Sequence, residues 1–274
     1  MNIRILCIGD VVGITGRTMF AKHIDAIRKE HRIDATIVNG ENSADDGRGI
    51  TQRVMQFFKQ HHVDVVTSGN HIYDKKDIFP YLAQNRDLLR PANFPSDNPG
   101  VGVSLFTCKS TTVAVINVQG RVFMKQDLDC PFRTVTSLLT YLKDKTKIIV
   151  VDFHAETTAE KAGLVYYLEG KVSAVVGTHT HVQTADERIL PGGTATITDL
   201  GMVGSLNSMI GMKKESIILN FLTQMPAKFF VETEAPGLLN GVIIEIDITS
   251  GRAVMIERIR IIDPELKVEL ADDK

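Results

Sequence analysis

The chain has 274 residues, of which 43% are hydrophobic, and its formal net charge is −2. This length can bury a large core, and the charge balance gives no reason to expect nucleic acid as a default partner. No segment approaches the roughly 20 apolar residues of a membrane-spanning helix, and MNIRILCIGD does not resemble a secretory leader. Three cysteines without a CxxC motif indicate reduced thiols. We therefore expect a cytoplasmic protein with no membrane partner.

Strand-like and helix-like segments alternate in the N-terminal part of the chain. The apolar patterns predict strands over 3–8, 35–38 and 63–67, and helices over 16–30 and 50–60. A β-α-β-α-β order is typical of a largely parallel sheet that is covered by helices.

Strands dominate after residue 91. The sequence predicts two hairpins, one around TCKSTT at 107–112 and one around Thr249-Ser250-Gly251. There are too many predicted strands for one sheet, so we expect two sheets. No repeat and no linker-like composition interrupts the chain, and we predict one domain over 1–274. The strands are expected at 101–106, 113–118, 148–153, 173–176, 194–197, 242–248 and 253–262, and a helix is expected at 134–143.

Polar side chains follow five of the predicted strands, at the point where each strand ends. In open α/β sheets, ligands bind beyond the carboxyl ends of the strands, so these side chains are expected to converge on one crevice. They are Asp10, Glu41 with Asn42, Asn70 with His71, His154, and His179 with His181.

The pair His179 and His181 suggests a metal site. Residues i and i+2 of an extended chain point the same way, so both imidazoles would aim at one small volume. Imidazole and carboxylate ligands suit Mn, Fe or Zn, and the candidate groups are enough for two ions that share a carboxylate. A single strand-end Asp or Asn is usually a turn residue or helix cap, and a lone His is usually structural. Their recurrence at several strand ends favours the metal site.

Six sequence blocks contain the polar strand ends and their neighbours. They are GDVVGITGR (9–17), NGENSADDGRGI (39–50), TSGNHIYDKKDI (67–78), VDFHAETTAEK (151–161), GTHTHVQTAD (177–186) and TDLGMVG (198–204). With these blocks the sequence resembles the calcineurin-like metallophosphoesterases, and within them the bacterial YmdB-like branch of cyclic-nucleotide phosphodiesterases. The resemblance implies a four-layer α/β/β/α sandwich, which agrees with the expectation of two sheets.

The resemblance also implies the residues of a site with two metal ions, Fe or Mn. The wider superfamily usually begins with DxH, where this chain has Val12, and it usually bridges its metals with Asp, where this chain has Glu41. Asn42 is expected to fill the place that Val12 leaves. One ion would be held by Asp10, Glu41, Asn42 and His181, and the other by Glu41, Asn70, His154 and His179.

The implied reaction is hydrolysis of small phosphodiesters, and of 2′,3′-cyclic nucleotides in particular. A hydroxide shared by the two metals would attack phosphorus in line, and His71 would protonate the departing oxygen. Two alternatives stay open: a phosphomonoesterase or phosphoprotein phosphatase with the same metals, and a metal-dependent regulatory scaffold. A scaffold needs ligands but no proton donor, so the presence of His71 favours an enzyme.

Three further expectations concern residues around the site and the surface. Asp152 either orients His154 or satisfies its own strand. Arg17 either contacts a phosphate or is a solvated residue at a helix start. The resemblance implies a homo-oligomer, and the apolar segment 217–231 either covers the core or forms an interface.

Overall fold

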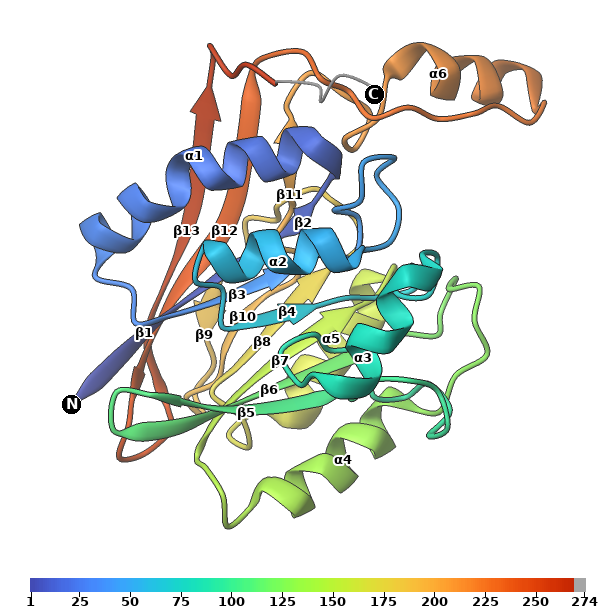
Figure 1. Cartoon of the computed structure of the whole chain (residues 1–274). Coiled ribbons are helices and arrows are strands. Elements are labelled where there is room, and N and C mark those ends of the chain that lie inside the picture. The colour runs from blue at the N-terminus through green and yellow to red at the C-terminus, as the bar shows by residue number, and fades with distance from the viewer. Residues whose placement is uncertain (269–274) are drawn as a thin grey trace.

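Two β-sheets pack face to face at the centre of the molecule in the computed structural model, which describes residues 1–268 (Figure 1). The first sheet has the order β2 (Asp10–Val11), β11 (Met202–Ser205), β12 (Gly237–Asp247), β1 (Asn2–Ile8), β3 (Ala35–Asn39) and β4 (Val65–Thr67), with β13 (Ala253–Asp263) paired to β12. The second has the order β5 (Val103–Cys108), β6 (Thr111–Gln119), β7 (Ile148–His154), β8 (Ala174–Thr178), β10 (Ala195–Ile197) and β9 (Arg188–Ile189).

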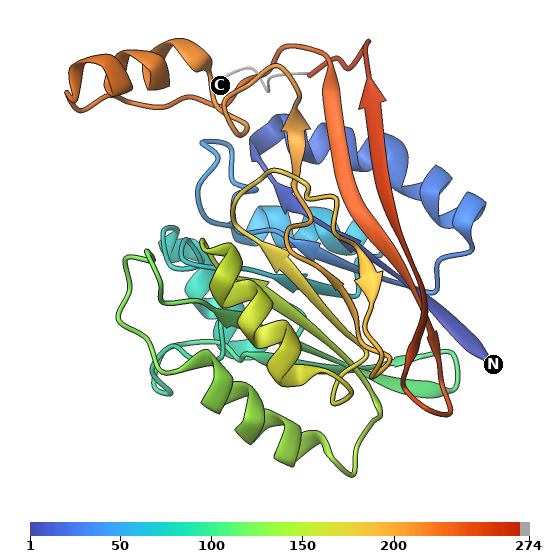
Figure 2. The same ribbon diagram turned by 180° about the vertical axis from the view of Figure 1, so that it is seen from behind.

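Helices cover the outer face of each sheet. On the first sheet lie α1 (Gly13–His31), α2 (Gln52–Gln60) and α3 (Phe79–Gln84), the last preceded by the 3₁₀ turn η1 (Lys76–Ile78). On the second lie α4 (Pro131–Leu142) and α5 (Thr158–Leu168), which face the viewer in Figure 2. The helix α6 (Lys214–Thr223) projects away from both sheets (Figure 1).

Alternation of side chains along β1 explains the layers. Leu6 and Ile8 join the core beneath α1 and α2, whereas Ile5 and Cys7 join the core between the two sheets. Successive residues of a strand point to opposite faces, so a strand that is buried on both faces reads as a continuous apolar run. The predicted α/β/β/α sandwich is thereby confirmed.

Parallel pairing places the polar strand ends at one edge of the sandwich. The strand β1 pairs in parallel with β3, and β3 with β4. In the second sheet β6, β7, β8 and β10 are also parallel neighbours. The carboxyl ends of parallel strands lie together, so loops from both sheets meet where the sheets are in contact.

The structure differs from the sequence prediction in a few elements. The first hairpin turn is shorter than predicted, because Cys108 still pairs with Thr111. The helix α5 was not predicted, since its exposed tyrosines Tyr166 and Tyr167 interrupt the apolar periodicity around Leu164 and Leu168. Strands β2, β9 and β11 are two to four residues long and give no readable pattern. Among residues 1–268, no helix combines the length and the apolar character that crossing a membrane requires.

Candidate metal centre

A tight turn after β3 delivers the first two candidate ligands. The Gly40 N–H donates to the carbonyl of Thr67 at 2.9 Å, and the Ser43 N–H returns to the carbonyl of Gly40 at 3.1 Å. Between these bonds, Glu41 and Asn42 project from the sheet edge and are both buried. A buried carboxylate needs a compensating charge or several hydrogen bonds, so this turn alone indicates a site for positive charge.

The first group of ligand atoms surrounds the buried imidazole of His154. Its Nε2 lies 3.1 Å from Glu41 Oε1, 3.0 Å from Asn70 Oδ1 and 3.1 Å from His179 Nδ1. Glu41, His154 and His179 all offer ligand atoms within 4.8 Å of one another. These residues come from both sheets, because Glu41 follows β3 whereas His154 ends β7 and His179 follows β8.

The hydrogen bonds behind His154 fix which ring nitrogen faces this group. The Thr178 hydroxyl donates to Asp152 Oδ1 at 2.8 Å, so it can only accept from His154 Nδ1, which lies 2.9 Å away. The proton of neutral His154 is therefore on Nδ1, and the Nε2 lone pair faces Glu41. When His154 is neutral, a carboxylate, an amide oxygen and two imidazole nitrogens converge with no proton between them, which is the arrangement a metal cation satisfies.

A second group lies on the other side of Glu41. His181 Nδ1 donates to the carbonyl of Ile210 at 2.9 Å, which leaves its Nε2 lone pair directed at Asp10 Oδ1, 3.7 Å away. Asp10 Oδ1 is buried and has no hydrogen-bond partner among the described residues. Asn42 Nδ2 lies 3.0 Å from His181 Nε2 and 3.3 Å from Glu41 Oε1, and a half-turn of the amide presents its oxygen instead. The orphaned carboxylate oxygen fits a second cation.

The electrostatics of both groups favour positive charge between them. Burial by itself lowers the pKa of His154, but the adjacent Glu41 carboxylate raises it to about 9. Burial opposes ionisation of Glu41, yet His154 brings the pKa of Glu41 down to about 2. Burial and the His154 charge lower the pKa of His179 to about 3, so its imidazole is neutral. Burial raises the pKa of Asp10 to about 7, with His181 opposing the shift. The place beside Glu41 thus attracts a proton or a metal cation.

Gly69, in the GNH block, allows the two sheets to approach at this point. A Cβ at this position would collide with the His154 ring and with Glu41 Oε2. The neighbouring Asn70 and His71 can therefore lie over the carboxylate, and the His71 N–H donates to Glu41 Oε2 at 3.3 Å. Only glycine lets the backbone come so close to the ligand atoms.

His71 is beside the group but is held by a different partner. Its Nδ1 lies 2.8 Å from Asp74 Oδ2, one turn further along the chain. Asp74 is in turn 3.8 Å from the Arg48 guanidinium. With Nδ1–H donated to Asp74, the remaining ring nitrogen of His71 is free to exchange a proton with a substrate.

The prediction that an extended chain aims His179 and His181 at one volume is wrong, although both side chains reach the site. The strand β8 ends at Thr178, and His179 and His181 have left-handed backbone angles, with φ of 103° and 66°. The loop is held by Asp199, which accepts the Thr180 N–H at 3.0 Å. The two imidazoles therefore point into separate groups instead of one volume.

The structure places the two remaining candidates outside the ligand groups. Asp152 is buried behind His154 and acts on it through the Thr178 hydroxyl, and burial raises its pKa above the ordinary range. Arg17 is also buried, and its guanidinium donates to the carbonyl of Ser43 and to the carboxylate of Asp45. In the described structure Arg17 holds the loop after β3, and it is not solvated as one reading expected.

Several contributors escaped the sequence reasoning. They are Thr178, which relays Asp152 to His154, Asp74 beside His71, Glu156 at 3.0 Å from His179 Nε2, and the buried pair of Lys161 with Asp199 at 2.7 Å. Thr178 precedes the HTH pattern directly, and Asp74 is three residues after His71, so spacing alone was a usable signal. Lys161 and Asp199 are 38 residues apart, so their pairing left no signal in the local sequence.

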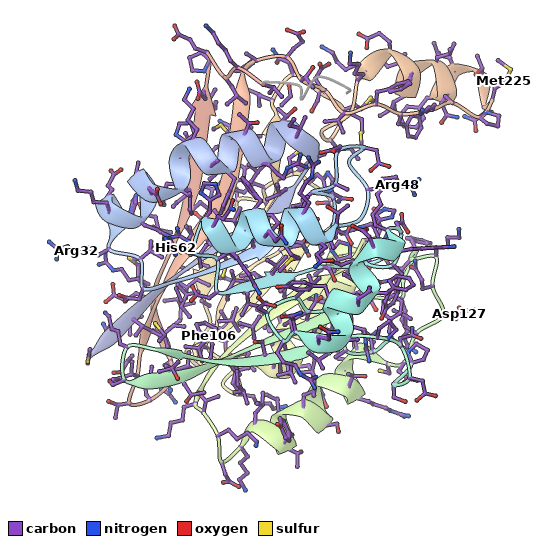
Figure 3. The ribbon with its side chains drawn as sticks, viewed as in Figure 1. Arg32, Arg48, His62, Phe106, Asp127 and Met225 are labelled. Atoms are coloured by element: carbon purple, nitrogen blue, oxygen red, sulfur yellow. The ribbon has the colours of Figure 1, made fainter. Side chains whose placement is uncertain are left out.

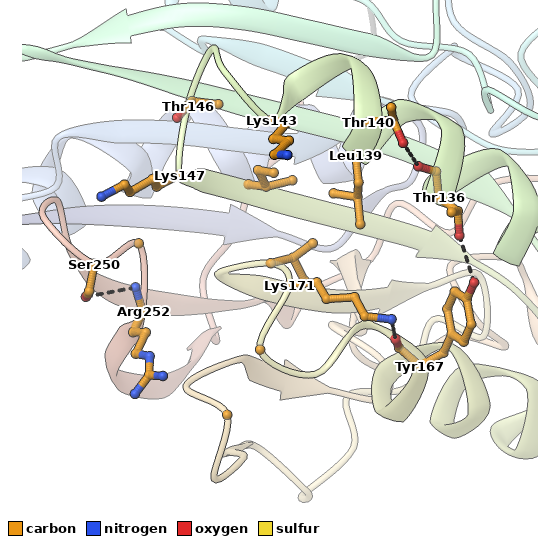
Figure 4. Close-up of a pocket in the computed structure, with 15 residues that line it drawn as sticks. Thr136, Leu139, Thr140, Lys143, Thr146, Lys147, Tyr167, Lys171, Ser250 and Arg252 are labelled. Atoms are coloured by element: carbon orange, nitrogen blue, oxygen red, sulfur yellow. Dashed lines mark hydrogen bonds between the residues drawn. The ribbon is translucent and has the colours of Figure 1, made fainter.

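A pocket of about 510 Å³ lies away from these groups and has a structural explanation (Figure 4). Lys143, Lys147, Lys171 and Arg252 line it. Helices α4 and α5 both end here, and the last carbonyls of a helix carry partial negative charge. Lys171 Nζ donates to the carbonyl of Tyr167 at 2.8 Å, as this explanation requires. Lys171 therefore offsets the end of α5, while Lys147 Nζ donates to the carbonyl of Thr249 at 3.0 Å.

Comparisons with known proteins agree with the geometry. A family model described as YmdB-like protein matches residues 6–259. A 2′,3′-cyclic-nucleotide 2′-phosphodiesterase of Bacillus subtilis is 46% identical, over 97% of this chain and 100% of the relative. A crystal structure of a hypothetical protein from Thermus thermophilus has a TM-score of 0.88 and 36% identity, over 96% of this chain and 100% of that one. A novel phosphatase from Mycoplasma pneumoniae has a TM-score of 0.90 and 33% identity, over 96% and 95%. The chain belongs to the YmdB-like protein family.

Proposed function

We propose that this protein is a metal-dependent phosphodiesterase that hydrolyses 2′,3′-cyclic nucleotides. The observation that carries the proposal is the pair of groups on either side of Glu41, each of which gathers buried carboxylate, amide and imidazole side chains within contact distance. The B. subtilis relative carries the same activity in its description. We assign two ions, Fe or Mn, to the two groups, with Glu41 as the shared ligand. When bound, two such cations supply Lewis-acid stabilisation of the phosphate and an activated water.

The chain's own residues orient the ligands and move the proton. Thr178 keeps the His154 proton on Nδ1, and the Ile210 carbonyl does the same for His181. His71 donates a proton to the departing oxygen of the ester, with Asp74 fixing its orientation through Nδ1. In a cyclic diester the broken bond is P–O, so water ends as a hydroxyl on phosphorus and the sugar oxygen leaves as an alcohol.

The experiment that tests the proposal compares three substrates on metal-loaded protein: a 2′,3′-cyclic nucleotide, the corresponding nucleoside monophosphate, and a phosphopeptide. Preference for the cyclic diester by 100-fold or more in kcat/KM is expected. Preference for the monoester or the phosphopeptide would replace the proposal with the phosphatase alternative. Bound metal without turnover of any of them would support the regulatory scaffold. Metal analysis of the purified protein counts and identifies the ions.

The proposal also covers the domain organisation of the chain and its cellular compartment. We propose one domain over 1–274, of which 269–274 lie outside the described residues. Pairing of β12 with β1 supports it, since the two ends of the chain share one sheet. The free thiols of Cys7, Cys108 and Cys130 support a reducing, cytoplasm-like compartment.

Self-association is supported by the apolar surface of α6 and the segment after it. Ile217 is buried, but seven other large apolar side chains there are each between 44% and 78% exposed. Together they expose about 700 Å², taking about 150–250 Å² for a large side chain, which is close to the 800 Å² per partner of a standard interface. Light scattering tests whether a second copy of the chain covers this surface. It compares the protein with a variant that carries both Phe221→Ser and Leu222→Ser. The seven are Ile218, Leu219, Phe221, Leu222, Met225, Phe229 and Phe230.

A further inference from the structure

The loop that follows β6 presents the most exposed large hydrophobic side chain of the described residues. Phe123 is 87% exposed, whereas the next such side chain, Leu222, is 78% exposed. Its backbone has φ of 60°, a left-handed conformation that bulky residues seldom adopt. A strained residue of this kind persists only where its surroundings hold it in place, and such residues concentrate at functional sites.

The surroundings of Phe123 hold it firmly. The N–H groups of Arg121 and Val122 donate to the Glu160 carboxylate at 3.0 to 3.1 Å, and the Met124 N–H closes a turn on the Arg121 carbonyl at 3.3 Å. Glu160 is itself placed by α5. The tip of the loop is therefore fixed while its aromatic ring is left in solvent.

Both ends of the loop are tied to candidate metal ligands. The Gly120 N–H donates to the carbonyl of His154 at 2.9 Å, and Gln126 Nε2 donates to the carbonyl of Asn70 at 3.3 Å. Phe123 is three residues from each anchor, so its Cα is within about 11 Å of both. Figure 3 shows Asp127, on the same loop, at the end of the molecule where Arg48 of the loop after β3 also lies. The loop that carries Phe123 is thus fastened at both ends to the backbone of residues whose side chains belong to the ligand groups.

We propose that Phe123 is the stacking platform for the nucleobase of the substrate, an inference that rests on the proposed function. A cyclic nucleotide with its phosphate on the ligand groups carries a planar base a few ångströms away. An exposed aromatic ring on a fixed loop offers that base a face without first giving up contacts of its own. Stacking is tolerant of base identity, so the platform favours nucleotides over other phosphodiesters without selecting one base.

The test measures binding, so that it does not depend on turnover. Metal-loaded protein is titrated by calorimetry with adenosine 3′-monophosphate and with ribose 3-phosphate, which lacks the base. The wild type is expected to prefer the nucleotide by about 5- to 150-fold, the range found when stacking side chains are replaced by alanine. Phe123→Ala is expected to abolish this preference and leave ribose 3-phosphate affinity unchanged, whereas Phe123→Trp keeps it.

Two further variants separate stacking from loop structure. Phe123→Asn removes the ring but adopts left-handed backbone readily, so it keeps the loop and is expected to behave as Phe123→Ala. Tyr141→Ala removes an aromatic side chain that is 54% exposed on α4 and is expected to keep the preference. A wild type without preference, or a preference that survives both Phe123→Ala and Phe123→Asn, overturns the inference. Failure of the proposed function appears separately, as absent cyclic-nucleotide hydrolysis.

Discussion

The relay from Asp152 through Thr178 to His154 gives a sharp prediction for Thr178→Val. Valine has the shape of threonine and suits a strand, so the substitution removes a hydroxyl without leaving a cavity. It leaves the His154 Nδ1–H and Asp152 Oδ1 without the partners that they have at 2.9 and 2.8 Å. Both groups are at most 2% exposed, so water does not replace the hydroxyl.

The expected loss follows from these two orphaned groups. Each buried group without a partner costs about 1–3 kcal/mol, so the free energy of unfolding should fall by about 2–6 kcal/mol. The His154 ring also loses the contact that keeps its proton on Nδ1, and loss of such a contact typically weakens metal binding by about 10- to 100-fold. Urea unfolding measures the first quantity, and chelator competition at fixed pH measures the second.

Thr196→Val is the matched control. Thr196 is 3% exposed on β10, next to β8, and its hydroxyl has no hydrogen bond to a described residue. Its replacement should change stability by less than 1 kcal/mol and leave metal affinity unaltered. If Thr178→Val and Thr196→Val behave alike in both assays, the tautomer argument for His154 is refuted.

Four further outcomes are expected. Asp74→Ala removes the acceptor of His71 Nδ1 and so frees the ring. It should lower kcat by about 10-fold or more at unchanged metal content, with the larger loss for esters of poor leaving groups. Equal loss for all leaving groups would contradict this role. Gly69→Ala should abolish metal binding while the far-UV spectrum stays native, because its Cβ would occupy the space of His154 and Glu41. Lys161→Met should reduce the free energy of unfolding by about 3–5 kcal/mol in urea, since Asp199 would be left buried without its charge partner, and a loss below 1 kcal/mol would show the pair to be dispensable. Chelation of the metal should lower the midpoint of thermal unfolding by about 5–10 °C, and adding the metal back should restore it. This shift corresponds to the stabilisation of about 2.7 kcal/mol by a ligand present at 100 times its dissociation constant.

The sequence predicted two sheets and the gathering of the candidate ligands because both follow from short-range patterns. Apolar runs such as the one from Ile3 to Ile8 identify strands that are buried on both faces, and polar residues directly after them mark the crevice. The second half of the chain was harder, since β9 and β11 are too short to show a period and α5 exposes two tyrosines.

The orientation of the ligands could not be predicted in the same way. It depends on partners that are distant in sequence, as when Asp199 shapes the loop of His179 and Ile210 fixes the ring of His181. The left-handed backbone of His179 replaces the extended chain that the HTH pattern indicates, and the modest enrichment of histidine at positive φ is too weak to predict it. The role of Arg17 likewise required knowing that Asp45 comes within reach.

The ligand groups span the boundary between the two sheets, and this arrangement makes the core between them a spacer. Glu41 belongs to one sheet and His154 to the other, so the distance between their ligand atoms is set by side chains such as Ile37, Val150 and Val176. A methyl group removed far from the crevice changes that distance without touching any ligand. Metal affinity should therefore report the thickness of the sandwich, and substitutions in this core should select between metal ions of different radius.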